Sequence, residues 1–223
     1  MSILSKARRA AEKAFAPGSV LSYSQSGEDL VLDFLTGYAP TGFYVDVGCN
    51  HPIRLSNSYR FYRKGWAGIC IDANPKFARA FRSQRPRDQF IQACVSDREE
   101  QVTFHIFASD TLSSISGNRL YDNGDHYALD EVQALTTQPL GSILDAAGAP
   151  TDFEFLSIDV EGHDEPALRS IDLVRYRPRV ILIELHGADV GHIDKMPVAQ
   201  HLASCGYTPI AAHWTNLFFM RQD

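Results

Sequence analysis

The feature that most constrains the fold of this 223-residue chain is a short apolar run that ends in polar residues and recurs between helix-like segments. These runs are residues 42–47, 67–71, 90–95, 153–160 and 179–185. Apolar strands that alternate with helices are typical of a parallel sheet covered by helices on both faces. Two more strand-like segments, 207–211 and 216–221, are close enough in sequence to pair as an antiparallel hairpin. The pattern predicts an α/β fold with a seven-stranded, mostly parallel sheet and an antiparallel C-terminal hairpin.

The length and composition favour one domain. Hydrophobic residues make up 44% of the chain and charged residues 22%, which is ordinary for a globular protein. We expect a single domain over residues 23–223, preceded by a helical extension over residues 1–22. Residues 102–107 alternate like an added edge strand. Residues 108–138 are polar and weakly patterned, so we expect an insertion or lid there that contacts the acceptor.

The ends of the first two strands point to a nucleoside cofactor. In open α/β sheets, ligands bind beyond the carboxyl ends of the strands. Asp72 ends the second strand, where a carboxylate can accept both hydroxyls of a ribose. Gly48 follows the first strand, but the loop after it lacks the second and third glycines of G-x-G-x-x-G, and no helix starts directly behind it. This loop favours an adenosine without a diphosphate, such as S-adenosylmethionine, over NAD.

Five sequence blocks, taken in order, resemble the FkbM family. The blocks are residues 23–29 (YSQSGED), 42–52 (GFYVDVGCNHP), 65–68 (GWAG), 71–75 (IDANP) and 157–163 (SIDVEGH). The resemblance implies a class I methyltransferase with a Rossmann-like three-layer sandwich and S-adenosylmethionine as its cofactor. It also implies a small acceptor, usually methylated on oxygen, such as a sugar or a glycosylated natural product.

The resemblance further implies which residues bind the cofactor. Asp46, Gly48 and Asn50 would line its methionine end, and Asp72 would bind its ribose. The other expected contacts are Ala73, Asp159, the adenine-flanking Ser96 and Asp97, and Gln25, Glu28 and Ser114, which would close over the cofactor.

A second group of polar residues follows the fourth and fifth strands of the predicted sheet. The candidates for catalysis there are Asp159, His163, Glu184 and His186, with Glu161 between them. A neutral imidazole with a pKa near ~6.5 suits a base that removes a hydroxyl proton at neutral pH. Alternatively, Asp159, Glu184 and His186 bind Mg2+ or another divalent cation that orients the acceptor. The sequence leaves both mechanisms open.

We therefore expect an S-adenosylmethionine-dependent O-methyltransferase that acts on a small hydroxyl acceptor. Two other classes of function stay open. One is a metal-dependent phosphoesterase that uses the same Asp/Glu/His group, and the other is a non-catalytic cofactor-binding module.

Composition also limits the partners. The net charge of −6 gives no electrostatic footprint for nucleic acid. No apolar run is long enough to insert stably in a membrane, and residues 1–16 lack the apolar core of a secretory signal, so we expect a cytoplasmic protein. The four cysteines form no C-x-x-C pair and are expected to be reduced and buried. Trp66 and Trp214 are expected in the core, and a homo-oligomer stays open.

Overall fold

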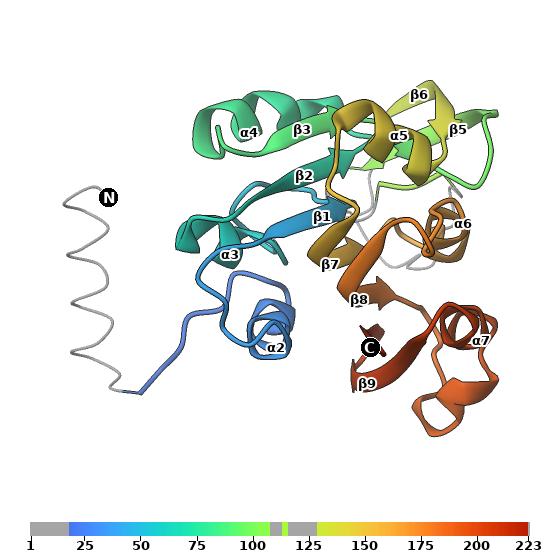
Figure 1. Cartoon of the computed structure of the whole chain (residues 1–223). Coiled ribbons are helices and arrows are strands. Elements are labelled where there is room, and N and C mark those ends of the chain that lie inside the picture. The colour runs from blue at the N-terminus through green and yellow to red at the C-terminus, as the bar shows by residue number, and fades with distance from the viewer. Residues whose placement is uncertain (1–17, 108–112, 116–128, 223) are drawn as a thin grey trace.

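A seven-stranded sheet forms the centre of the computed structural model, which describes residues 18–107, 113–115 and 129–222 (Figure 1). Its strand order is β3-β2-β1-β7-β8-β10-β9. The first five of these strands run parallel, whereas β10 is antiparallel to both β8 and β9. The predicted α/β fold with a mostly parallel sheet and an antiparallel C-terminal hairpin is confirmed.

The strands of this sheet follow the apolar runs of the sequence closely. They are β1 (Phe43–Val47), β2 (Ala67–Asp72), β3 (Gln89–Gln92), β7 (Asp152–Ile158), β8 (Arg177–Glu184), β9 (Tyr207–His213) and β10 (Asn216–Arg221). In the central strand β1, Val45 pairs with Ile69 on one side and with Leu156 on the other. Strands buried on both faces read as nearly continuous apolar runs, which explains why the pattern identified them.

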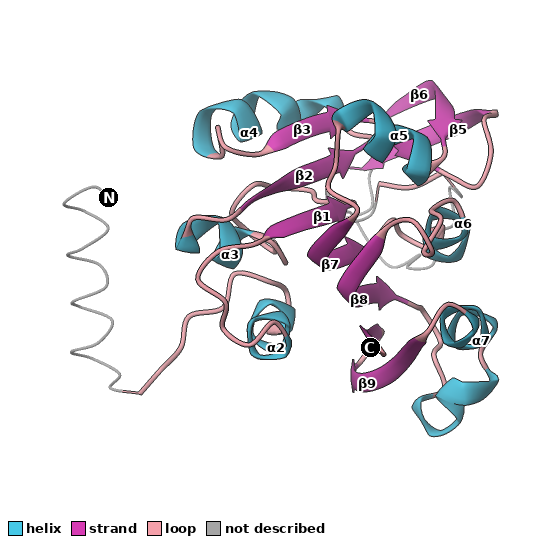
Figure 2. Cartoon of the chain, in the orientation of Figure 1, coloured by secondary structure: helices cyan, strands magenta, loops and turns pink. Residues whose placement is uncertain are grey.

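Helices cover both faces of the sheet (Figure 2). One face carries α2 (Glu28–Leu35), α3 (Tyr59–Lys64), η1 (Pro75–Phe77) and α4 (Ala78–Gln84). The other carries α5 (Leu140–Ala147), α6 (Asp164–Arg169) and α7 (Pro197–Ser204), with η4 (Val190–Lys195) leading into α7. Alternate residues of β1 serve the two cores, because Val45 and Val47 join the α5–α7 side while Tyr44 joins the α2–α4 side. The chain is a three-layer sandwich.

A second, smaller sheet has the order β4-β6-β5 and contains β4 (Cys94–Val95), β5 (Gln101–Phe107) and β6 (Leu129–Gln138). The strand predicted over residues 90–95 is therefore divided between two sheets, since β3 ends at Gln92 and β4 pairs with β6. The added strand near residues 102–107 is present as β5.

Two predicted segments fall partly outside the described residues. Residues 1–17 of the expected helical extension lie outside them, as do residues 108–112 and 116–128 of the expected lid. The end of the lid segment, residues 129–138, is strand β6 instead of loop. The single-domain division itself stays a prediction.

The described part of the chain also bears on cysteines and membranes. All four cysteines are free thiols, and three of them are buried. Among the described helices, none is long and apolar enough to cross a membrane.

Candidate active site

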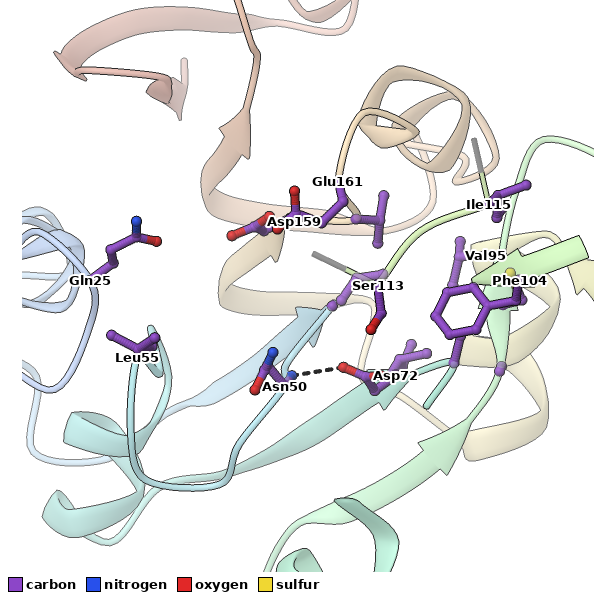
Figure 3. A pocket seen from close by; sticks show the side chains of 17 residues that line it. Gln25, Asn50, Leu55, Asp72, Val95, Phe104, Ser113, Ile115, Asp159 and Glu161 are labelled. Carbon is purple, nitrogen blue, oxygen red and sulfur yellow. Dashed lines mark hydrogen bonds between the residues drawn. The ribbon is translucent and has the colours of Figure 1, made fainter. Parts of the chain in front are cut away.

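A cleft opens at the carboxyl ends of β1, β2 and β7, where the chain order of the sheet reverses (Figure 3). Including the part open to solvent, it holds about 800 Å³. Polar groups of its wall come from Gln25, Gly48, Asn50, Asp72, Ser113, Asp159 and Glu161. Apolar groups come from Val47, Leu55, Ile71, Ala73, Ala93, Cys94, Val95, Phe104, Ile115 and Val160.

Asp72 is held in place by the backbone on both sides of its carboxylate. Its Oδ2 accepts a hydrogen bond from the Asn50 backbone N–H at 2.8 Å, and its Oδ1 accepts one from the Asn74 backbone N–H at 2.8 Å. Each carboxylate oxygen keeps a further acceptor position. Burial raises the pKa of Asp72 to about 6. The geometry suits a pair of neighbouring hydroxyls, as on a ribose.

Gly48 allows the loop after β1 to pass directly against the end of β7. Its φ is +78°, and a Cβ there would lie 1.7 Å from the Asp159 carbonyl oxygen. The backbone N–H groups of Gly48 and Cys49 both donate to the Ile71 carbonyl, at 2.9 and 3.1 Å. A glycine is required here by close approach as well as by backbone conformation.

A buried arginine holds residues 52–56, the later part of this loop, in place. Arg85 is fully buried and its Nε donates to Asp88 at 2.6 Å. Its Nη1 donates to the Pro52 carbonyl at 3.2 Å and to Ser56 Oγ at 3.3 Å. The guanidinium thus ties α4 to the segment that carries Asn50 and Leu55 into the cleft.

Asp46 and Glu28 do not line the cleft, although both were expected at the cofactor. Asp46 lies on the α2–α4 side of β1, where it accepts a hydrogen bond from Ser58 and where burial raises its pKa. Glu28 is buried, and its two carboxylate oxygens accept from the Ser26 backbone N–H and the Asn216 amide. Both carboxylates stabilise segments next to the cleft.

Ser96, Asp97 and Ser114 are displaced from the cleft by a few residues. The wall near β4 is formed by Ala93, Cys94 and Val95 instead. Ser114 pairs its backbone with His105, and its neighbours Ser113 and Ile115 line the cleft in its place. Alternation along an extended chain sends successive side chains to opposite sides, which accounts for the difference between Ser114 and its two neighbours. Of the other expected cofactor residues, the cleft contains Gln25, Gly48, Asn50, Asp72, Ala73 and Asp159.

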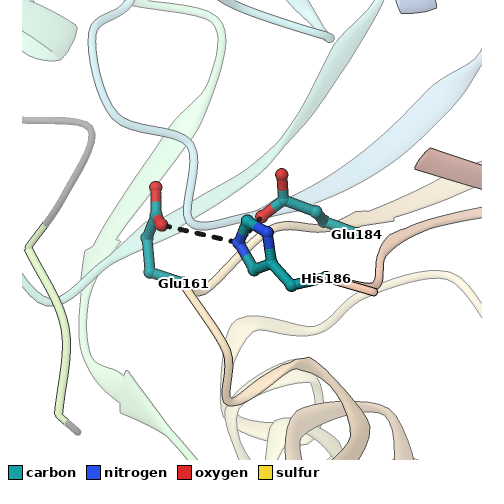
Figure 4. A group of neighbouring side chains, drawn as sticks. All are labelled: Glu161, Glu184 and His186. Atoms are coloured by element: carbon teal, nitrogen blue, oxygen red, sulfur yellow. Dashed lines mark ion pairs between the residues drawn. The ribbon is translucent and has the colours of Figure 1, made fainter. Parts of the chain in front are cut away.

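Next to the cleft lies a group formed by Glu161, Glu184 and His186, whose ligand-type atoms all lie within 4.8 Å of one another (Figure 4). His186 Nε2 is 3.1 Å from Glu184 Oε2 and 3.9 Å from Glu161 Oε2. Thr215 Oγ1 donates to Glu184 Oε1 at 3.0 Å. Glu184 Oε2 is buried and accepts no aligned hydrogen bond from any described residue.

Three carboxyl groups in and beside this group have raised pKa values. Burial, followed by the charge of Glu184, raises the pKa of Asp159 well above its ordinary value. The same two causes raise the pKa of Glu161 to about 8. Burial also raises the pKa of Asp164 to about 7, although its carboxylate accepts from the Val160 and Gly162 backbone N–H groups. At neutral pH Glu161 therefore carries a proton that it can donate.

His163 is separate from this group, contrary to the arrangement expected for the catalytic residues. Its Nε2 lies 2.8 Å from the hydroxyl of buried Ser96, and burial lowers its pKa. The charged residues that act on it are Asp97, Arg98 and Glu100, beside the small sheet. The residues that could bind a cation also differ from the expected set. Asp159 was expected beside Glu184 and His186, but the structure places Glu161 there instead.

Several cleft residues were not anticipated. Cys94, Val95, Phe104, Ser113 and Ile115 come from the small sheet and the segment paired with it, and Ala93 directly precedes that sheet. The alternation of residues 102–107 was the one signal for that sheet, and it did not show which side would face a ligand.

Comparison with known proteins identifies the family of this chain. The model of the methyltransferase FkbM domain matches residues 46–209, which is more than half of the chain. One similar solved structure is a TehB-like SAM-dependent methyltransferase from Corynebacterium glutamicum, with 15% identity, a TM-score of 0.42, and 98% of this chain and 97% of that chain covered. Another is 1,6-didemethyltoxoflavin-N1-methyltransferase from Burkholderia thailandensis with bound 1,6-didemethyltoxoflavin and S-adenosylhomocysteine, at 10% identity, a TM-score of 0.48, and 99% and 86% covered. No curated protein matches the sequence. From the family match, we conclude that the chain belongs to the FkbM family of S-adenosylmethionine-dependent methyltransferases.

Proposed function

We propose that this methyltransferase transfers a methyl group to an oxygen of a small hydroxyl-bearing acceptor, and that the acceptor is a sugar. One observation carries the proposal: Asp72 lines the cleft that also contains Glu161, which is grouped with Glu184 and His186. The Asp72 carboxylate suits the ribose of a nucleoside. The group of Glu161, Glu184 and His186 suits an acceptor hydroxyl that must lose a proton.

The residues of the cleft fit the cofactor. Asp72 would hold the ribose with its remaining acceptor positions, and the apolar side chains of Val95, Phe104 and Ile115 would contact the adenine. Asn50 and Asp159 would hold the methionine part. When bound, S-adenosylmethionine supplies a methyl group that its positively charged sulfur has already activated.

The remaining task for the protein is to orient the acceptor and remove its proton. His186, which is exposed, can accept that proton, and Glu184, 3.1 Å away, stabilises the resulting imidazolium. General-base assistance of this kind contributes roughly 10²–10⁴-fold to the rate. Protonated Glu161, whose pKa is about 8, can donate a hydrogen bond to the acceptor.

A metal-assisted form of the same reaction is the second candidate. The buried Glu184 Oε2 has no aligned partner among the described residues, and Glu161 and His186 offer ligand atoms beside it. These three residues would hold Mg2+ or another divalent cation, which would lower the pKa of a bound hydroxyl. The family assignment gives no support to the phosphoesterase alternative.

The proposal is tested by incubating the protein with labelled S-adenosylmethionine and a panel of methyl glycosides and nucleotide sugars, each with magnesium and with a chelator. We expect labelled ethers, a loss of about hundredfold in rate for His186→Ala, and unchanged S-adenosylhomocysteine affinity in that variant. His163→Ala is the matched control and should keep its rate. Label on nitrogen or carbon instead of oxygen would contradict the proposal. Loss of activity with chelator would assign the metal-assisted form.

A further inference from the structure

The tip of the β9–β10 hairpin carries a tryptophan that packing does not explain. Trp214 is 74% exposed, and its ring makes no aromatic or cation–π contact with the described residues. The expectation that both tryptophans are core residues is therefore wrong for Trp214. It holds for Trp66, which is buried, packs against Phe61 and donates its indole N–H to the Ala39 carbonyl. Packing in the core therefore does not account for the tryptophan at the tip.

The backbone at the tip disfavours a bulky side chain. His213 pairs with Asn216, so the turn consists of Trp214 and Thr215. Trp214 has a φ of +54°. In tight hairpin turns, positions with this conformation are normally occupied by glycine, asparagine or aspartate. Unfavourable backbone conformations persist where surrounding structure enforces them, and they concentrate at functional sites.

The surrounding structure fixes this tip beside the group of Glu161, Glu184 and His186. Thr215 Oγ1 donates to Glu184 at 3.0 Å, and the Thr215 carbonyl accepts from the Leu185 backbone N–H at 2.7 Å. Asn216, on the other side of the turn, donates to Glu28 at 3.1 Å, three residues from Gln25 in the cleft wall. Trp214 is thus held at the same end of the molecule as the residues proposed to receive the acceptor.

We propose that Trp214 is a specificity-determining residue that forms one wall of the acceptor site and packs against the apolar face of a sugar ring. A pyranose presents C–H groups on its face and hydroxyls around its rim. An indole offers a large, rigid apolar surface for the face, and the nearby carboxylates and imidazole can bond the hydroxyls. A phenolic ring would also stack, but its single hydroxyl would leave most of these polar groups unpaired. The inference rests on the proposed function and adds that Trp214 contacts the apolar face of the sugar ring.

The test uses the full chain saturated with S-adenosylhomocysteine and titrated with methyl glycopyranosides, with phenol as a separate ligand. Tryptophan emission and calorimetry report binding. We expect a saturable change in emission with at least one glycoside, and affinity about tenfold or more weaker in Trp214→Asn. Asparagine suits the turn, so this variant should unfold at the same temperature as the wild type or at a higher one. Val174→Asn, another exposed apolar position at 81% exposure, is the matched control and should bind like the wild type.

The outcomes separate the two proposals. If S-adenosylhomocysteine does not bind the wild type, the proposed function fails. If it binds but no glycoside does, or phenol alone binds, the assignment of a sugar face to Trp214 is overturned. Equal glycoside affinity in wild type and Trp214→Asn also overturns it.

Discussion

Asp72 and Gly48 form the cofactor half of the cleft in different ways. Asp72 contributes a carboxylate that two backbone N–H groups hold in one position. Gly48 has no side chain, which lets the loop approach the Asp159 carbonyl closely. Asn50, which connects them, adopts φ of +48° and donates its backbone N–H to Asp72. These residues hold their positions through contacts within the protein itself. A substitution at Asp72 should therefore mainly change cofactor affinity, and one at Gly48 should mainly change stability.

Cofactor affinity should depend on pH through Asp72. Its pKa of about 6 means that the carboxylate is ionised at pH 7 and mostly protonated at pH 5. Protonation removes an acceptor for a ribose hydroxyl, so affinity for S-adenosylhomocysteine should fall about tenfold between pH 7 and pH 5. Calorimetric titration across this range measures the effect.

The change in affinity should not reflect unfolding. A carboxyl whose pKa is raised in the folded state binds its proton more tightly there than in the unfolded chain. The contribution of Asp72 to the free energy of unfolding therefore increases as the pH falls from about 6 toward 4. Asp72→Asn should show weak binding with a flat pH profile, and a flat profile in the wild type would refute the assignment.

Gly48→Ala should destabilise the fold by about 3 kcal/mol or more, because the new Cβ would meet the Asp159 carbonyl oxygen in a strained backbone conformation. Gly148→Ala is a matched control, since Gly148 has φ of +68° but a Cβ there would lie more than 4 Å from the described residues around it. That variant should lose only about 1 kcal/mol. Urea unfolding compares them, and equal losses would show that close approach to β7 is unimportant.

At the level of elements, the sequence predicted those strands that a local run of apolar residues identifies. Strands β1, β2, β7 and β8 are buried on both faces, so their apolar runs are unmistakable. Strand β6 was missed because it is polar and largely exposed, and its pairing with β5 and β4 is a long-range property. The division of residues 90–95 between two sheets depends on the same pairing.

The candidate site shows a similar limit. Asp46, Asp72 and Asp159 all lie at or just beyond the carboxyl ends of strands, as the sequence indicated, but only the latter two line the cleft. Asp46 lies inside β1, one residue before its end, where it accepts a hydrogen bond from Ser58, whereas Asp72 is the last residue of β2 and Asp159 follows β7. His163 was misplaced because its partner, Ser96, follows a strand whose end could not be located from sequence.

Arg85 tests how α4 supports the loop between Asn50 and Ser58. Arg85→Met should lower the free energy of unfolding by about 3–5 kcal/mol, because it leaves buried Asp88 without its charged partner. It should also weaken cofactor binding, since Pro52 and Ser56 lose their donor. Arg82→Met, on the exposed side of the same helix, should change stability by less than about 0.5 kcal/mol in the same urea titration. Similar losses in both variants would contradict this role.

At the scale of the whole molecule, strand order is what brings the two halves of the site together. β1 lies between β2 and β7, so the loop after β1 meets both Asp72 and Asp159. β8 follows β7, and the β9–β10 hairpin follows β8, which sets Glu184 and Thr215 side by side.

The most direct test of cofactor binding at Asp72 is calorimetric titration of the wild type, Asp72→Ala and His163→Ala with S-adenosylhomocysteine at pH 7.5. We expect saturable one-site binding in the wild type, affinity at least about tenfold weaker in Asp72→Ala, and unchanged affinity in His163→Ala. No binding in the wild type, or equal affinity in wild type and Asp72→Ala, would contradict this expectation.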